Sequence, residues 1–93
     1  MNEKLKEAAK EIGAAAVFIE AMVDPKCDVQ ANRNAVFECI TRAAALLVQA
    51  EKSPKVVFAR EELQRAAKFM SKQQAWNARD ILAPLSLLLE EEN

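Results

Sequence analysis

Carboxylates are the first side chains in this sequence that could carry out acid–base chemistry, and two patterns place them near one another. Glu61 and Glu62 are adjacent, and Glu3, Glu7 and Glu11 follow each other at helical spacing. Neighbouring residues on a helix point about 100° apart, so Glu61 and Glu62 do not converge on one substrate. The other three carboxylates alternate with lysines, which is typical of a solvated helix face. Neither pattern predicts a catalytic pair.

The remaining catalytic signatures are missing from the sequence. It contains no histidine to act as a general base. It has neither a G-x-S-x-G nor an H-E-x-x-H motif, and its single glycine, Gly13, cannot form a phosphate-binding glycine loop. We therefore expect no enzymatic activity, no cofactor and no metal site.

The two cysteines, Cys27 and Cys39, fit no zinc-binding or C-x-x-C spacing. We interpret them as free thiols in a reducing compartment, in preference to a disulfide between them. Cys39 falls within an apolar helical stripe, where it is expected to be a small buried hydrophobic residue. Cys27 lies by a connection and is the more reactive thiol of the two.

The charge of the chain is unevenly distributed. The formal net charge is −1, which predicts no general attraction to nucleic acid or to anionic membranes. Residues 52–79 nevertheless carry seven basic side chains against Glu61 and Glu62, whereas the segments before and after them are net acidic. The sequence therefore contains a basic third quarter.

Aromatic and basic side chains share one face of this quarter if residues 54–83 form a continuous helix. Six of them project within about 100° of one another, largely opposite the apolar stripe, at 100° per residue. They are Phe58, Arg65, Lys68, Phe69, Lys72 and Trp76. Trp, Phe and Arg dominate the energetics of protein interfaces. This face is the predicted partner-binding surface.

A structural interpretation of the same face stays open. A helix at the centre of a bundle is buried on two sides, and Phe58 and Phe69 would then meet different neighbouring helices, covered by the basic side chains. If the chain breaks at Ser71, Trp76 leaves the face altogether.

Two functional hypotheses follow from this segment. The first is a protein-binding module, such as an adaptor, inhibitor or regulator, that also self-associates as a dimer. The second is nucleic-acid binding by residues 52–79, with Trp76 stacking on bases and basic side chains on phosphates, namely Arg65, Lys68, Lys72 and Arg79. The negative net charge and the absence of a helix-turn-helix motif with its turn glycine speak against the second. A structural subunit of a larger assembly cannot be distinguished from the first by sequence.

Helical periodicity predicts the elements that must position these residues. Apolar residues recur at steps of three and four over about residues 2–23, and again over about residues 29–51. In the first segment they are Leu5, Ala8, Ile12, Ala15, Ile19 and Met22, and in the second Val36, Cys39, Ile40, Ala43, Leu46, Leu47 and Ala50. Gly13 lines up with Ala9 and Ala16, which predicts a close approach of a neighbouring helix.

Two proline dipeptides punctuate the chain in the same way. Asp24-Pro25 and Ser53-Pro54 each predict the end of one helix and the start of the next at the proline. The third helix then runs from Pro54 to at least Met70, with core residues Val56, Ala59, Leu63, Ala66 and Met70.

The sequence leaves open whether the third helix continues beyond Met70. Ser71 and Gln74 have the spacing of a capping box, which favours a new helix. No glycine or proline interrupts residues 55–83, however, and the apolar stripe keeps its phase through Gln74, Ala78 and Ile81. Pro84 either kinks this helix or lies in the first turn of a last one.

Four helical stretches with short connections predict an all-α fold, a small antiparallel bundle of about four helices arranged as two helical hairpins, within a single domain of residues 1–93. The apolar runs 12–19 and 81–89 are shorter than the ~20 residues that span a bilayer. Acidic residues interrupt the start of the chain, where a secretory signal would be apolar. We expect a soluble, cytoplasmic protein with no membrane partner.

Overall fold

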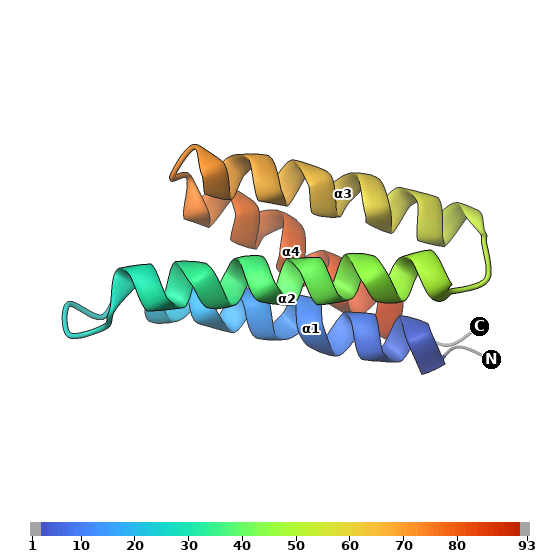
Figure 1. Cartoon of the computed structure of the whole chain (residues 1–93), viewed down its shortest axis with the longest axis horizontal. Helices are drawn as coiled ribbons and strands as arrows, with labels where there is room; N and C mark the ends of the chain where they lie inside the picture. The colour runs from blue at the N-terminus through green and yellow to red at the C-terminus, as the bar shows by residue number, and fades with distance from the viewer. Residues whose placement is uncertain (1–2, 92–93) are drawn as a thin grey trace.

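The computed structural model describes residues 3–91, which form four helices joined by short connections (Figure 1). The helices are α1 (Glu3–Ala21), α2 (Val29–Gln49), α3 (Pro54–Ser71) and α4 (Ala75–Glu90). No strand occurs among the described residues. The prediction of an all-α bundle of about four helices is confirmed.

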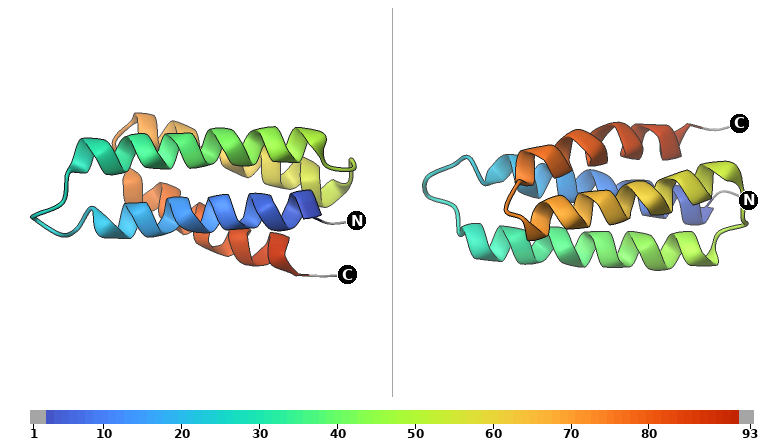
Figure 2. Two further views of the ribbon diagram at one scale, coloured as in Figure 1. Left: turned by 60° about the horizontal axis from the view of Figure 1, so that its bottom comes forward. Right: turned by 90° about the horizontal axis from the view of Figure 1, so that it is seen from above.

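Successive helices run antiparallel and form a rod of 41 × 20 × 18 Å. α1 packs against α2 and α4, α3 packs against α4, and the contact between α2 and α3 is the least extensive (Figure 2). The two ends of the described chain lie at the same end of the rod. The arrangement is therefore two helical hairpins, α1–α2 and α3–α4, packed side by side.

The starts of α2 and α3 show that only one of the two proline dipeptides begins a helix. Ser53 caps α3, because its Oγ accepts a hydrogen bond from the backbone N–H of Val56 at 3.3 Å, and Pro54 follows as the first helical residue. The matching expectation for Pro25 is wrong. α2 begins at Val29, where the Asp28 side chain accepts from the N–H of Ala31 at 3.0 Å.

The chain breaks between α3 and α4, so residues 54–83 are not one helix. Gln73 has a φ of 60°, and the N–H groups of Gln73 and Gln74 donate to the carbonyls of Met70 and Phe69, at 3.0 and 2.8 Å. This is a Schellman motif with glutamine in the left-handed position. Ser71 is the last residue of α3 rather than a cap, and Gln74 makes no side-chain capping bond.

We expect Gln73→Gly to raise the free energy of unfolding by about 1 kcal/mol, because glycine adopts the left-handed conformation without the cost of a Cβ. Gln74→Gly is the matched control, since Gln74 has an ordinary negative φ of −108°. Urea unfolding of both variants measures the difference. Equal effects of the two substitutions would show that the backbone at Gln73 is unstrained.

The core follows the predicted stripes up to the break, and beyond it only in part. Its apolar members come from all four helices: Ala8, Ala9, Ile12, Ala15, Ala16, Ile19, Val36, Cys39, Ile40, Ala43, Leu47, Val56, Ala59, Leu63, Ala66, Met70, Ala78, Leu82, Leu85 and Leu89. Gln74 is exposed, and Leu82 rather than Ile81 is fully buried in α4. Ala78 is buried as predicted, and the turn at Gln73 resets the helical phase, which explains why the continuous stripe was wrong at Gln74 and Ile81.

α1 and α4 approach closely at Gly13, as predicted. The hydroxyl of Ser86 is buried and donates a hydrogen bond to the backbone carbonyl of Ala9 at 2.8 Å. A Cβ on Gly13 would lie 3.1 Å from this Oγ but 3.9 Å from the Ser86 Cβ. The Ser86 hydroxyl therefore occupies the space that a side chain at position 13 needs.

This geometry predicts that the effect of Gly13→Ala depends on residue 86. In a Ser86→Ala background we expect Gly13→Ala to raise the free energy of unfolding by about 1 kcal/mol, the helix-propensity difference between alanine and glycine. With Ser86 present the gain is smaller, because the hydroxyl must move and its bond to Ala9 is strained. Urea unfolding of the four proteins of this cycle measures the coupling, and additive effects would contradict the close contact.

Candidate functional site

The helix break separates one of the six predicted binding residues from the others. Phe58, Arg65, Lys68 and Phe69 lie on α3 and Lys72 follows its last residue as the C-cap, but Trp76 lies in the first turn of α4. The prediction that Trp76 shares their face is wrong, since it required a continuous helix through Gln74.

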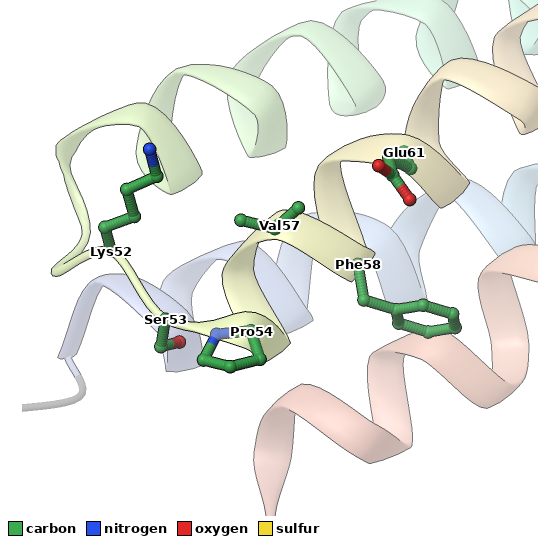
Figure 3. A pocket seen from close by; sticks show the side chains of 6 residues that line it. All are labelled: Lys52, Ser53, Pro54, Val57, Phe58 and Glu61. Carbon is green, nitrogen blue, oxygen red and sulfur yellow. The ribbon is translucent and has the colours of Figure 1, made fainter.

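These other five residues differ in their surroundings. Phe58 is 48% exposed, and its ring extends from α3 toward α4 (Figure 3). The Arg65 guanidinium donates from Nη1 to both carboxylate oxygens of Glu62, at 3.0 and 2.9 Å. Phe69 is half-buried against the core, in agreement with the structural interpretation of this residue. Lys68 and Lys72 are exposed.

A groove of about 470 Å³ lies between α3 and α4, beside Phe58. We call it the α3/α4 groove, and its lining residues are Phe58, Glu62, Arg65, Asp80, Ile81, Pro84, Leu85 and Leu88. α3 contributes the aromatic ring and the Glu62–Arg65 ion pair, whereas α4 contributes mostly aliphatic side chains. The α4 wall was not among the predicted binding residues, although the apolar run 81–89 was the signal for it.

A second hollow, of about 570 Å³, lies at the start of α3 and is lined by Lys52, Ser53, Pro54, Val57, Phe58 and Glu61 (Figure 3). Phe58 belongs to both hollows. The ring is therefore an accessible apolar group between two concave surfaces, which is the position of an anchor residue in many interfaces.

α4 exposes apolar side chains on its outer side as well as burying its inner face. Trp76 is 49% exposed and Leu87 is 65% exposed. Pro84 is also exposed, and Ile81 and Leu88 are half-buried. A helix that is apolar beyond one stripe normally has neighbours on more than one side. In this structure the outer side of α4 has no neighbour among the described residues.

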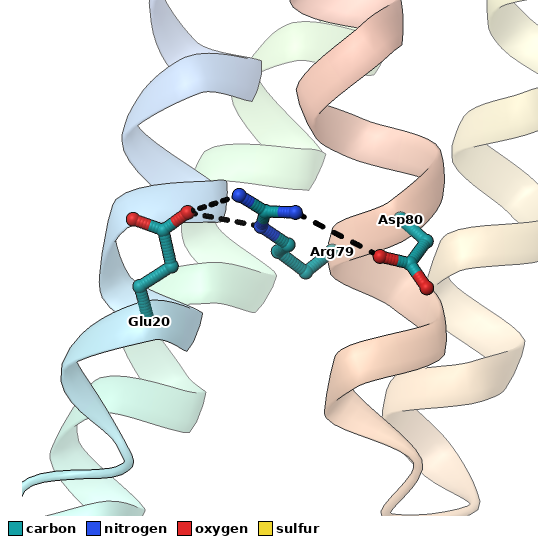
Figure 4. A network of polar contacts seen from close by, with 3 residues as sticks. All are labelled: Glu20, Arg79 and Asp80. Atoms are coloured by element: carbon teal, nitrogen blue, oxygen red, sulfur yellow. Dashed lines mark hydrogen bonds and ion pairs between the residues drawn. The ribbon is translucent and has the colours of Figure 1, made fainter.

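Arg79 connects α4 to α1 and also contacts Trp76. Its Nε and Nη2 donate to Glu20 Oε2 at 2.9 and 2.7 Å, and its Nη1 lies 3.8 Å from Asp80 Oδ1 (Figure 4). The guanidinium carbon is 5.8 Å from the centroid of the Trp76 ring, within the range of a cation–π contact. Arg79 is thus engaged in contacts within the bundle.

The buried thiol of Cys39 is part of a polar contact between α1 and α2. Arg42 donates from Nε to Glu11 at 3.0 Å and from Nη2 to the Cys39 sulfur at 3.6 Å. Burial, and secondly the charge of Glu11, raises the pKa of the Cys39 thiol above its ordinary value. Cys39 is therefore a protonated, inert core residue, as expected, while Cys27 is half-buried.

This difference predicts both thiol reactivity and alkaline stability. We expect a thiol reagent to modify Cys27 in the folded protein and Cys39 only after unfolding.

Above the unfolded-state thiol pKa of about 8.5, the unfolded chain loses a proton that the folded chain retains, so the stability falls as the pH rises. Unfolding curves at a series of pH values should show this loss in the wild type, and the loss should be smaller in Cys39→Ala. An identical alkaline loss in the two proteins would contradict the raised pKa.

Comparisons with known proteins add no functional assignment. No protein-family model matches the chain, and neither the curated proteins nor the solved structures gave a match. Within residues 3–91, no group of three or more His, Cys, Asp or Glu side chains is placed to hold a metal ion. None of the helices in the described part of the chain is long and apolar enough to cross a membrane.

Proposed function

We propose that this protein is a small protein-binding module and that the α3/α4 groove is its binding surface. The observation that carries the proposal is the half-exposed Phe58 ring beside an aliphatic wall of α4. An aromatic anchor, a neighbouring arginine and an aliphatic surface are the side chains that dominate protein interfaces. A groove between two helices receives a further helix through such contacts.

The contacts of Arg79 and Arg65 weaken the nucleic-acid hypothesis. Arg79 and Arg65, two of the four predicted phosphate ligands, are bound to Glu20 and Glu62. The Trp76 ring, which was to stack on bases, has the Arg79 guanidinium beside it. Of the four predicted phosphate ligands Lys68 and Lys72 then remain, so the predicted set is halved, although Lys52 and Arg60 are further exposed cations of residues 52–79. The protein-binding hypothesis assigns a role to the Phe58 ring and to the α3/α4 groove. Phosphate binding gives them no role.

Affinity capture with matched variants tests the proposal. Tagged wild type, Phe58→Glu and Leu87→Glu are used as baits, and the bound proteins are identified by mass spectrometry. Leu87 is a suitable control, because it is 65% exposed on α4 and lies outside the groove. We expect a partner that binds to the wild type and to Leu87→Glu but not to Phe58→Glu. Circular dichroism should show the same helicity for all three proteins.

Loss of the partner from Leu87→Glu alone would place the binding surface elsewhere on α4. Retention by all three baits would exclude the groove. The two unpaired thiols support a reducing compartment, and we propose a cytoplasmic location on that basis.

A further inference from the structure

We infer that a second surface of this protein, between α2 and α3, binds an acidic amphipathic helix of a partner protein. A groove of about 180 Å³ lies there, and we call it the α2/α3 groove. It shares no lining residue with the α3/α4 groove. The inference therefore goes beyond the proposed function and does not depend on it.

The α2/α3 groove follows the seam at which neighbouring helices of the bundle make their least extensive contact. Its uncharged lining residues are Ile40, Ala44 and Val48 from α2, and Leu63, Gln64 and Ala67 from α3. Ile40 and Leu63 are buried and form an aliphatic floor, and the small side chains of Ala44 and Ala67 leave room for a further helix. At 1.5 Å per residue, the α2 wall from Ile40 to Val48 is about 12 Å long, a little over two helical turns.

Arg60 gives this groove its charge. It is exposed, and it is the one charged side chain among the described residues that line the groove. Arg42, Arg65 and Arg79 each bind a carboxylate within the bundle, but Arg60 makes no ion pair within residues 3–91. The adjacent Glu61 points about 100° away and lines a neighbouring hollow that Arg60 also borders. The groove thus presents an unpaired guanidinium beside an aliphatic floor, and a carboxylate is the group that binds a guanidinium most specifically.

The surroundings of the groove also favour an acidic partner. The only acidic residue of α2, Glu38, does not line the groove and acts on Arg42, which contacts Glu11 of α1. Lys68 follows Gln64 by four residues, so an exposed ammonium group continues the same face of α3. An acidic helix therefore meets complementary charge here, whereas a basic helix meets like charge. A nucleic acid makes no use of the aliphatic floor.

Peptide display on the wild-type protein tests the inference. A phage library presents short helical peptides with aliphatic residues fixed at positions i, i+4 and i+7 and all other positions randomised. Selected peptides are synthesised, and fluorescence anisotropy gives their dissociation constants for wild type, Arg60→Glu and Arg65→Glu. We expect peptides with Asp or Glu beside the aliphatic stripe, whose dissociation constant rises at least about tenfold for Arg60→Glu, because like charges then meet. Exchange of that peptide carboxylate for lysine should restore binding to Arg60→Glu.

Arg65→Glu is the matched control, because it makes the same chemical change on α3 outside the α2/α3 groove, and it should leave these dissociation constants unchanged. The inference is overturned if no selected peptide distinguishes Arg60→Glu from wild type, if the responding peptides carry no carboxylate, or if the lysine exchange does not restore binding. Peptides that respond to Phe58→Glu alone would support the proposed function and overturn this inference. A fluorescent oligothymidine that binds the wild type and is lost from Arg60→Glu, where no peptide responds, would assign this surface to a nucleic acid instead.

Discussion

Replacing Leu82 by alanine is expected to lower the free energy of unfolding by about 3 kcal/mol. Leu82 is fully buried in α4, between its neighbours in the core. Truncation removes apolar contacts and leaves a cavity that the packed helices refill only in part, which costs 2–5 kcal/mol for a leucine as a rough range. A domain of this length has a total stability of about 5–14 kcal/mol. The substitution therefore removes a large share of it.

Leu87→Ala is the control for this substitution. It makes the same chemical change five residues later on the same helix, at a side chain that is 65% exposed. We expect its effect to stay within about 0.5 kcal/mol, and both values follow from urea or thermal unfolding. Similar losses in the two variants would contradict the orientation of α4, or would show that Leu87 is covered in solution.

Pro84→Ala is expected to stabilise the protein by about 2 kcal/mol. Pro84 lies inside α4, where it has no N–H to donate to the carbonyl one turn earlier, and its ring crowds that carbonyl. Proline costs about 3 kcal/mol relative to alanine in a helix interior, and we expect most of this cost to be recovered in the variant. Because Pro84 is exposed, alanine leaves no cavity in the core.

Pro54→Ala provides the contrast for Pro84→Ala. Pro54 is the first residue of α3, where the backbone N–H has no partner within the helix in any case. We expect a change of less than about 0.5 kcal/mol in its free energy of unfolding. A loss of stability in Pro84→Ala would contradict a net cost of the proline at this position.

The sequence predicted the features that depend on local structure. The cap at Ser53 and the buried stripes of α1, α2 and α3 each involve residues within a few positions of one another, so periodicity and capping rules were sufficient. The same rules placed a helix start at Pro25, but the side chain of Asp24 accepts from Lys26 in a turn, and Asp28 caps α2 instead. Two capping residues four positions apart compete, and the sequence does not rank them.

The rules of periodicity and capping could not predict the features that depend on tertiary contact. The turn at Gln73 uses a left-handed glutamine, whereas glycine or asparagine is the usual signal. The Glu20–Arg79 ion pair joins residues 59 positions apart. The groove likewise needs the wall from α4, whose position relative to Phe58 follows only from the α3–α4 hairpin. Four of the six predicted binding residues lie on α3 and Lys72 caps its end, but their grouping with Trp76 failed for the same reason.

Site-specific photo-crosslinking tests the central claim most directly, namely that the protein binds its partner through the α3/α4 groove. Benzoylphenylalanine is introduced at Phe58 in one variant, and at the exposed residue Leu87, outside the groove, in another. Each variant is irradiated in cells and the products are identified by mass. Our account predicts a covalent protein adduct from position 58 and none from position 87. An adduct from position 87, with none from position 58, would contradict it.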